Sequence, residues 1–202
     1  MRRTKEQSNL TRQALLRTAL LVFSRKGYAA TTLEDIVLAA KVTRGALYHH
    51  FSGKAEIFDV LLEEAIAAPS LVVQRILAEG TGFLEVIYRV FVEQIIVVET
   101  DAMYRATVEL VMFQLEASPE LESARQRLQL GRRTSLELLA QSFADGIRLG
   151  QVRRDLEPSQ VALMFLSLQI GLFQLWHSNP TDLKLELSAR ALADVLIAGI
   201  RA

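Results

Sequence analysis

Apolar residues recur at steps of three and four along nearly the whole 202-residue chain, which contains only four prolines. This spacing places apolar side chains on one face of an α-helix. There is no sustained alternation of apolar and polar residues bounded by turns, which is the pattern of half-buried strands. We therefore expect an all-α fold, with one or two helical domains of sizeable core.

The chain contains no cysteine, which excludes a disulfide framework and thiolate metal sites and fits a reducing cytosol. Arg17 interrupts the early apolar run and no small-residue cleavage pattern follows it, so we do not expect a signal peptide. The most apolar run, Val161 to Trp176, is shorter than the ~20 residues that span a bilayer. We expect a soluble, cytoplasmic protein with no membrane partner.

Charge is distributed unevenly, although the formal net charge is zero. Residues 1–54 contain ten Lys/Arg and three Asp/Glu, whereas the remaining residues contain thirteen and twenty. A basic head on an acidic body indicates a polyanionic partner for the head. Basic N-termini also occur without such a partner, so the helical pattern of the head has to decide between the two interpretations.

The head is predicted to contain three short helices. The first covers about residues 10–26, and Gly27 is a natural helix stop. At the start of the second, the pair Thr31–Glu34 has the spacing of a capping box, and the pair Thr32–Asp35 is a weaker version of it.

A tight turn separates the second helix from the third. It falls at Lys41 and Val42, after which Thr43 can cap the third helix while Leu47 and Phe51 point inward. Three helices in this order form a helix-turn-helix arrangement, which we assign to a DNA-binding domain at residues 1–53.

The third helix has the composition of a recognition helix. Such a helix enters the major groove by its N-terminal half, so residues 44, 45 and 48 would face base edges and phosphates. Arg44 can pair bidentately with guanine, and the small Gly45 and Ala46 let the backbone approach the groove. Tyr48 and His49 can donate to phosphates or touch thymine methyl groups.

Three further residues of the head, Thr32, Thr43 and Lys54, are expected near helix N-termini, where backbone N–H groups favour phosphate. An alternative interpretation makes Tyr48 and His50 ordinary packing residues. A metal site at His49 and His50 is not expected, because adjacent helical residues point about 100° apart. The predicted DNA-binding residues are Thr32, Thr43, Arg44, Gly45, Ala46, Tyr48, His49, His50 and Lys54.

Residues 9–58 resemble the DNA-binding domain of the TetR family of bacterial transcriptional regulators. The resemblance is carried by TRQALLRTALLVFSRKGYAATTLEDIVLAA, which begins at Thr11, and by VTRGALYHHFSGKAEIF, which begins at Val42. Within the family the chain is most similar to the multidrug-efflux repressors. The resemblance implies a homodimer that binds double-stranded operator DNA and a small hydrophobic or drug-like inducer.

One position departs from the family pattern, which usually has glycine in the turn between the second and third helices. The residue here is Lys41. If it is left-handed, its side chain costs roughly 1–2 kcal/mol. Either the lysine gains a phosphate contact in return, or the turn has a slightly different geometry.

The body, residues 54–202, is predicted to be a helical ligand-binding and dimerisation domain. Pro69 should kink or end its first helix, which joins the head to the body and is the natural lever between them. The expected helices cover about residues 54–67, 83–98, 102–116, 118–149, 158–178 and from 183 onward.

Some polar and aromatic side chains of the body lie inside apolar faces, as in a small-molecule site. An aromatic stripe at helical spacing is also common in a plain core, so both interpretations stay open, and the resemblance implies the pocket. The predicted ligand-binding residues are Tyr88, Phe91, Glu109, Phe113, Gln114 and Gln169. We expect no metal and no cofactor.

The last two helices are apolar on nearly every side and should be covered on every side. We infer that a second copy of the chain covers them in a four-helix interface; burial within the chain alone is the alternative. The predicted interface residues are Phe165, Leu168, Leu172, Trp176, Leu192, Val195, Leu196 and Gly199.

Our leading hypothesis is a homodimeric, ligand-responsive repressor, and the alternative is an architectural or ligand-independent DNA-binding protein. An enzyme is not expected. The sequence has no nucleophile elbow, no phosphate-binding loop and no His/Asp/Glu set at metal-ligand spacing, and His177 stands alone near a helix end.

Overall fold

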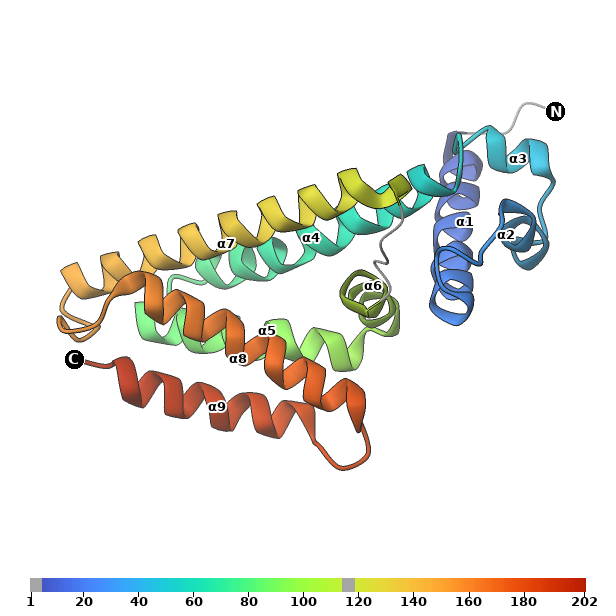
Figure 1. Cartoon of the computed structure of the whole chain (residues 1–202). Helices are drawn as coiled ribbons and strands as arrows, with labels where there is room; N and C mark the ends of the chain where they lie inside the picture. The colour runs from blue at the N-terminus through green and yellow to red at the C-terminus, as the bar shows by residue number, and fades with distance from the viewer. Residues whose placement is uncertain (1–4, 114–118) are drawn as a thin grey trace. The chain divides into compact units, whose positions relative to one another are not determined.

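In the computed structural model, which describes residues 5–113 and 119–202, the chain is all-α (Figure 1). The only β interaction among the described residues is an isolated bridge between Val152 and Arg201. The prediction of an all-α fold is confirmed. The helices are α1 (Lys5–Lys26), α2 (Leu33–Ala40), α3 (Arg44–Tyr48), α4 (Lys54–Ala78), α5 (Phe83–Thr100), α6 (Ala102–Phe113), the 3-10 helix η1 (Pro119–Leu121), α7 (Glu122–Arg148), α8 (Pro158–Ser178) and α9 (Leu185–Ile200).

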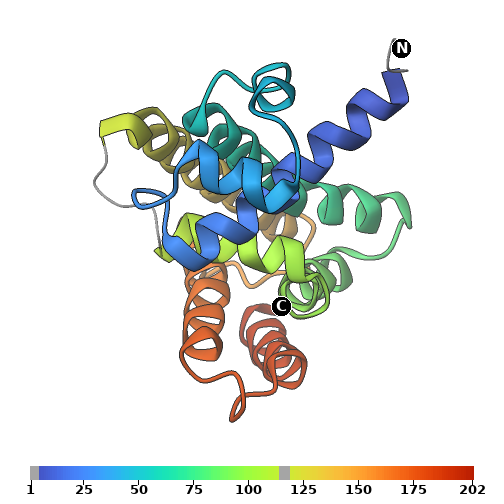
Figure 2. The same cartoon turned by 90° about the vertical axis from the view of Figure 1, so that its right-hand side faces the viewer.

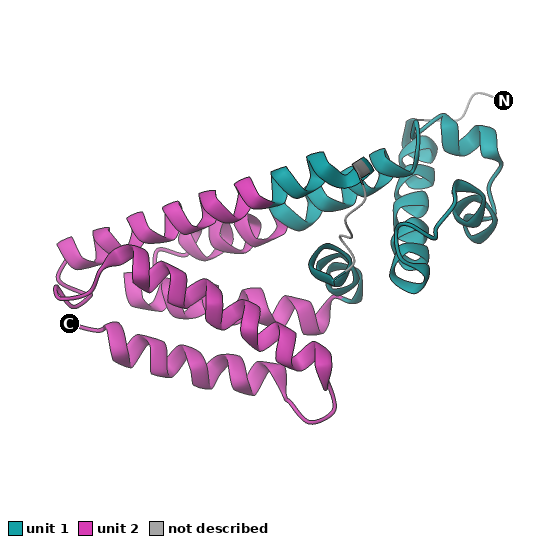
Figure 3. Cartoon of the chain, viewed as in Figure 1, with its two compact units in different colours: residues 1–67, 102–128 teal, residues 68–101, 129–202 magenta. Residues whose placement is uncertain are grey.

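The chain divides into two compact units (Figure 3). The first contains residues 1–67 and 102–128, and the second contains residues 68–101 and 129–202. This division differs from the predicted boundary between residues 53 and 54. The physical reason is that Leu110 of α6 and Leu121 of η1 are buried in the same core as α1, so segments distant in the sequence complete the first unit.

Pro69 was expected to kink or to end helix α4, and the helix does not end there. It continues to Ala78, although proline has no N–H to donate within the helix. The Gln94 side-chain Nε2 donates to the Pro69 carbonyl at 3.1 Å, and Ile76 beyond the proline is fully buried. Tertiary contacts therefore hold the second part of the helix in place.

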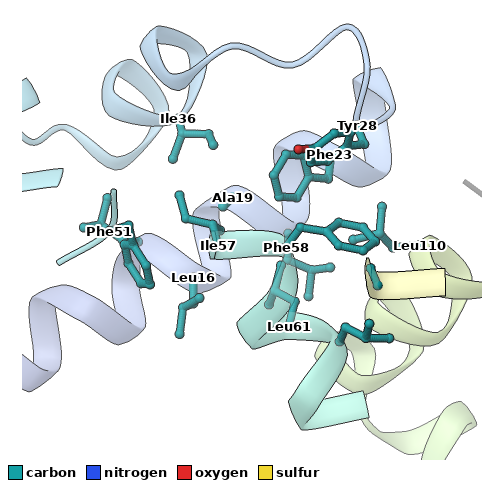
Figure 4. Packing of buried hydrophobic residues seen from close by; sticks show 14 of the residues in the cluster. Leu16, Ala19, Phe23, Tyr28, Ile36, Phe51, Ile57, Phe58, Leu61 and Leu110 are labelled. Atoms are coloured by element: carbon teal, nitrogen blue, oxygen red, sulfur yellow. The ribbon is translucent and has the colours of Figure 1, made fainter. Parts of the chain in front are cut away.

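An aromatic cluster forms the centre of the first unit's core (Figure 4). The Tyr28 ring lies 5.5 Å from the Phe23 ring and 5.2 Å from the Phe58 ring, centroid to centroid. The Tyr28 hydroxyl donates to Glu120 at 3.0 Å. Burial and this contact with a carboxylate raise the pKa of Tyr28. The cluster fixes the loop between α1 and α2 and thereby the position of the helices that follow.

The second unit has its own core, in which the Phe91 and Phe165 rings meet edge to face at 5.1 Å. Helices α8 and α9 run side by side in both views (Figures 1 and 2), and both pack on α5. In α7, Gly146 allows a close approach: a Cβ there would lie 2.5 Å from the Phe83 ring and 2.8 Å from Val152.

By length and composition, α8 is the one helix of the described residues that is apolar enough to cross a membrane. It has 21 residues because it begins at Pro158, before the apolar run considered in the sequence. Its stripe of Val161, Phe165 and Leu172 is buried in the second unit. Burial of this stripe is the behaviour of a core helix.

Candidate nucleic-acid interface and ligand-binding region

Thr32 is the N-cap of α2. Its hydroxyl accepts from the Asp35 backbone N–H at 3.2 Å, and the Asp35 carboxylate accepts from the Thr32 backbone N–H at 2.9 Å. The favoured pair Thr31–Glu34 is therefore not the capping box. Thr31 is buried and its hydroxyl instead donates to the Gly27 carbonyl at 2.7 Å. Thr32 itself is exposed, as a DNA contact requires.

The turn between α2 and α3 is left-handed at Lys41, with φ 53° and ψ 40°. The turn therefore has the left-handed conformation that usually favours glycine, although the residue here is lysine. A lysine side chain in this conformation costs roughly 1–2 kcal/mol compared with the right-handed one.

Helix α3 has only five residues and depends on its cap and on its buried side. The Thr43 hydroxyl accepts from the Ala46 backbone N–H at 3.2 Å, which confirms the predicted cap. Leu47 and Phe51 are buried, as expected. The opposite side of this segment exposes Thr43, Arg44, Gly45, Tyr48 and His49, and Ala46 is half-buried.

Arg44 and Tyr48 form a pair on the exposed side of α3. An Arg44 guanidinium N–H donates to the Tyr48 hydroxyl at 3.4 Å, and the guanidinium lies 5.7 Å from the centre of the tyrosine ring. The contact with Tyr48 raises the pKa of Arg44, which is charged in any case. Tyr48 is 47% exposed, so the alternative that it only packs is not supported.

The two adjacent histidines have different surroundings. His49 is exposed, whereas His50 is half-buried with its ring 6.4 Å from the Phe51 ring. This position favours the packing interpretation of His50. In residues 5–113 and 119–202, no group of three or more His, Cys, Asp or Glu side chains is placed to hold a metal ion.

Lys54 begins α4, as predicted, but its ammonium contacts the head itself. It donates to the Tyr28 carbonyl at 3.0 Å and lies 4.2 Å from the centre of the Tyr28 ring. A DNA phosphate would have to share or replace these contacts. Sequence reasoning missed this contact because 26 residues separate the two partners and no local pattern joins them.

Two of the predicted ligand-binding residues meet in the core of the second unit. The Gln169 Nε2 donates to the Phe91 carbonyl at 3.3 Å and to the Gln94 side-chain oxygen at 3.1 Å. Gln94 in turn donates to Pro69 of α4. A polar chain, buried at Gln169 and half-buried at Gln94, thus connects α8, α5 and α4, and Gln94 is the member that was absent from the predicted set.

The other predicted ligand-binding residues lie elsewhere. Tyr88 hydrogen-bonds Arg190 and lines a hollow of about 440 Å³ with Asp194 and Ile197 of α9. Glu109 and Phe113 belong to the first unit. Gln114 lies outside the described residues. The structure therefore joins Phe91 with Gln169 and does not show one site that contains all six residues.

The predicted dimer residues separate into two groups. Phe165, Leu172, Trp176 and Leu196 are between 1% and 7% exposed, because they pack against their own chain. They have almost no surface for a partner, so for Phe165, Leu172 and Trp176 the interface prediction needs correction, whereas Leu196 still lines the groove on α8 and α9. The exposed or half-buried members are Leu168, Leu192, Val195 and Gly199.

These four residues line an apolar groove of about 480 Å³ along α8 and α9. Met164, which lines the same groove, and the exposed Leu175 and Leu187 of the same two helices were not in the predicted interface set, although they belong to the same apolar helices. Met164, Leu168 and Leu175 are four and seven residues apart, so helical spacing places them in one stripe.

A capped, exposed third helix behind a left-handed turn, within a three-helix head, defines a helix-turn-helix DNA-binding protein. Residues 15–61 match the family described as bacterial regulatory proteins, tetR family. Residues 83–201 match the C-terminal region of MAATS-type transcriptional repressors. The chain belongs to the TetR family of transcriptional regulators.

Similar proteins cover nearly the full chain. The HTH-type transcriptional regulator TtgR of Pseudomonas putida is 29% identical over 92% of this chain and 89% of its own. NalD, the secondary repressor of the MexAB-OprM multidrug efflux pump in Pseudomonas aeruginosa, is 30% identical over 98% of each chain, with TM-score 0.82. SmeT of Stenotrophomonas maltophilia, in a complex with triclosan, is 25% identical over 96% of this chain and 92% of its own, with TM-score 0.83. The chain is thus a DNA-binding transcriptional regulator and not an enzyme.

Proposed function

We propose that this regulator is a cytoplasmic homodimeric repressor that leaves a near-palindromic operator when a small hydrophobic inducer binds. NalD and SmeT are both described as repressors of multidrug efflux pumps, and the SmeT complex contains triclosan. By analogy, we expect this chain to repress the gene of a multidrug efflux pump.

The observation that carries the proposal is the exposed side of α3. Arg44 and Tyr48 lie together on a helix that is capped by Thr43 and held from behind by the buried Leu47. Two such helices, related by a twofold axis, would fit successive major grooves about 34–36 Å apart. Symmetric half-sites at that spacing make the operator near-palindromic.

The apolar groove on α8 and α9 supports the dimer. Val195 is 71% exposed and Leu175 is 65% exposed, which is unfavourable for apolar side chains on two neighbouring helices unless a partner covers them. An interface between identical chains with twofold symmetry places the same stripe against itself.

The chain of glutamine amides supports an inducer effect on DNA binding. Gln169 and Gln94 connect the core of the second unit to Pro69, and Pro69 lies in the helix that begins at Lys54 in the DNA-binding head. A ligand that replaces one of these hydrogen bonds changes the support of α4. A coupling of roughly 1–3 kcal/mol is typical between two such sites, and it acts in both directions.

The DNA-binding assignment is tested with a duplex that the wild-type protein selects from a randomised library. Arg44→Ala should lower the affinity for this duplex by about tenfold to a hundredfold, because each lost guanine pair is worth about 1–3 kcal/mol. Tyr48→Phe keeps the ring and should have a smaller effect. Full retention of specific binding by both variants would contradict the assigned recognition residues.

The alternative is a DNA-binding protein that does not respond to ligands. Triclosan is a suitable probe, because SmeT forms a complex with it. Our proposal expects triclosan to raise the melting temperature and to weaken operator binding of the wild-type protein. A panel of hydrophobic drugs that includes triclosan and leaves both quantities unchanged would favour the alternative.

A further inference from the structure

The backbone conformation of Lys41 is unfavourable for its side chain. In the described part of the chain, Lys41 is the one non-glycine residue with positive φ, and the other positive-φ positions are Gly27, Gly80 and Gly150. Residues other than glycine rarely adopt this region because of their Cβ, and asparagine and aspartate enter it more readily than lysine. An outlier of this kind is a reason to ask what the side chain does.

The turn itself does not require a lysine. The Lys41 backbone N–H donates to the Leu38 carbonyl at 3.2 Å, and the Val42 N–H donates to the Val37 carbonyl at 3.2 Å. These bonds involve only the backbone. Glycine would form the same turn without strain, so the reason for a lysine has to lie in its side chain.

Within the part of the chain that the structure describes, no contact uses the Lys41 charge. Lys26 pairs with Asp35 at 2.5 Å, and Lys54 donates to the Tyr28 carbonyl. Lys41 is exposed, and none of the described carboxylates forms an ion pair with it. Its ammonium is therefore available to an external anion.

Lys41 precedes the N-cap of the recognition helix by two residues, so its Cα lies within about 7 Å of the Thr43 Cα. A four-carbon stem carries its ammonium further. The major groove is about 12 Å wide, and DNA carries one negative charge per ~1.7 Å of axis. When α3 lies in the groove, the ammonium can reach the phosphates at its edge.

We propose that Lys41 contacts a DNA phosphate and positions the recognition helix, and that the strained turn is retained for this contact. The inference rests on the proposed function and adds to it a residue outside the predicted DNA-binding set. It predicts that Lys41→Gly stabilises the folded protein and weakens its binding to DNA.

Three variants separate the side chain from the backbone. Lys41→Gly removes both the charge and the strain, Lys41→Ala removes only the charge, and Lys41→Arg keeps both. Each is titrated by fluorescence anisotropy, at several salt concentrations, with the duplex that the wild-type protein selects from a randomised library. A scrambled duplex of the same length is the control, and thermal unfolding gives the melting temperature.

We expect Lys41→Gly and Lys41→Ala to bind about two- to twentyfold more weakly, with a salt slope smaller by about one for each protomer. The loss should be equal on the scrambled duplex, because a phosphate contact carries no base information. Lys41→Arg should bind like the wild type. Only Lys41→Gly should melt higher, by about 2–4 °C.

A Lys41→Ala variant with wild-type affinity and salt slope would overturn the inference. A loss on the selected duplex only would overturn it too, because it would indicate a base contact. If the wild-type protein selects no duplex at all, the proposed function fails before the lysine is tested. The two failures are therefore distinguishable.

Discussion

Helices α3 and α8 expose opposite kinds of side chain, and this difference separates the two tasks of the molecule. The exposed side of α3 carries Arg44, Tyr48 and His49, which can hydrogen-bond a hydrated, charged polymer. The exposed side of α8 carries Met164 and Leu175, whose apolar side chains cannot donate hydrogen bonds to DNA phosphates or base edges. This difference supports the proposal that the head recognises DNA and that the body associates with a second copy.

The largest effect is expected from a substitution that disrupts dimer formation by the body and leaves the DNA-binding head unchanged. Val195→Asp places a charge in the proposed interface, at a side chain that is 71% exposed and therefore not needed for the fold of one chain. We expect a monomer by size-exclusion chromatography with light scattering. Operator affinity should fall on the order of a hundredfold or more, because two linked heads bind far more tightly than one.

Leu138→Asp is the matched control, since Leu138 is 66% exposed on α7 and outside the groove. It should remain dimeric and bind the operator normally. If Val195→Asp also remains a dimer, the interface lies on another surface.

A second prediction concerns the core behind the exposed faces of the body. Gly146→Ala forces a methyl group against Phe83 and Val152 and should destabilise the protein by about 1–2 kcal/mol, after allowance for the better helix propensity of alanine. Chemical denaturation of Gly146→Ala in the wild-type and Phe83→Ala backgrounds measures the coupling. An equal loss in both backgrounds would exclude the Phe83 contact as the cause.

The smallest expected effect is a pH dependence in the head. The hydrogen bond from Lys26, followed by those from Thr32, lowers the pKa of Asp35 to about 2. The folded-state pKa is below the unfolded value of about 3.9, so the stabilisation is complete above about pH 5 and is lost as the pH falls from there to about 2.

Asp35→Asn keeps the shape of this cap and removes the charge. We expect its melting temperature to be about 1–3 °C below that of the wild type near neutral pH, and the difference to disappear toward pH 2. A difference that stays constant over this range would show that the carboxylate charge is not the cause.

The sequence was sufficient to predict the buried and exposed sides of the helices of the head, because each helix has one apolar side. In α3 only Leu47 and the following Phe51 are strongly apolar, so the buried side, and with it the exposed side, is determined. The sequence did not determine whether Thr31 or Thr32 is the cap, because both have a suitable acidic residue three positions later. The structure decides it by burying Thr31.

The body could not be predicted to the same detail. Because α8 is apolar on almost every side, spacing alone cannot distinguish the stripe of Phe165 and Leu172 that packs inside from the stripe of Met164 and Leu168 that borders the groove. The polar chain from Gln169 through Gln94 to Pro69 joins segments 75 and 25 residues apart. No local pattern contains such a contact.

Reading of DNA by two linked heads is tested most directly by changing the distance between the operator half-sites. In the selected duplex, an insertion of about five base pairs turns one half-site to the opposite face of the DNA. We predict that fluorescence anisotropy will show a loss on the order of a hundredfold, to the affinity of an isolated half-site. Unchanged affinity for the lengthened operator would contradict a fixed pair of recognition helices.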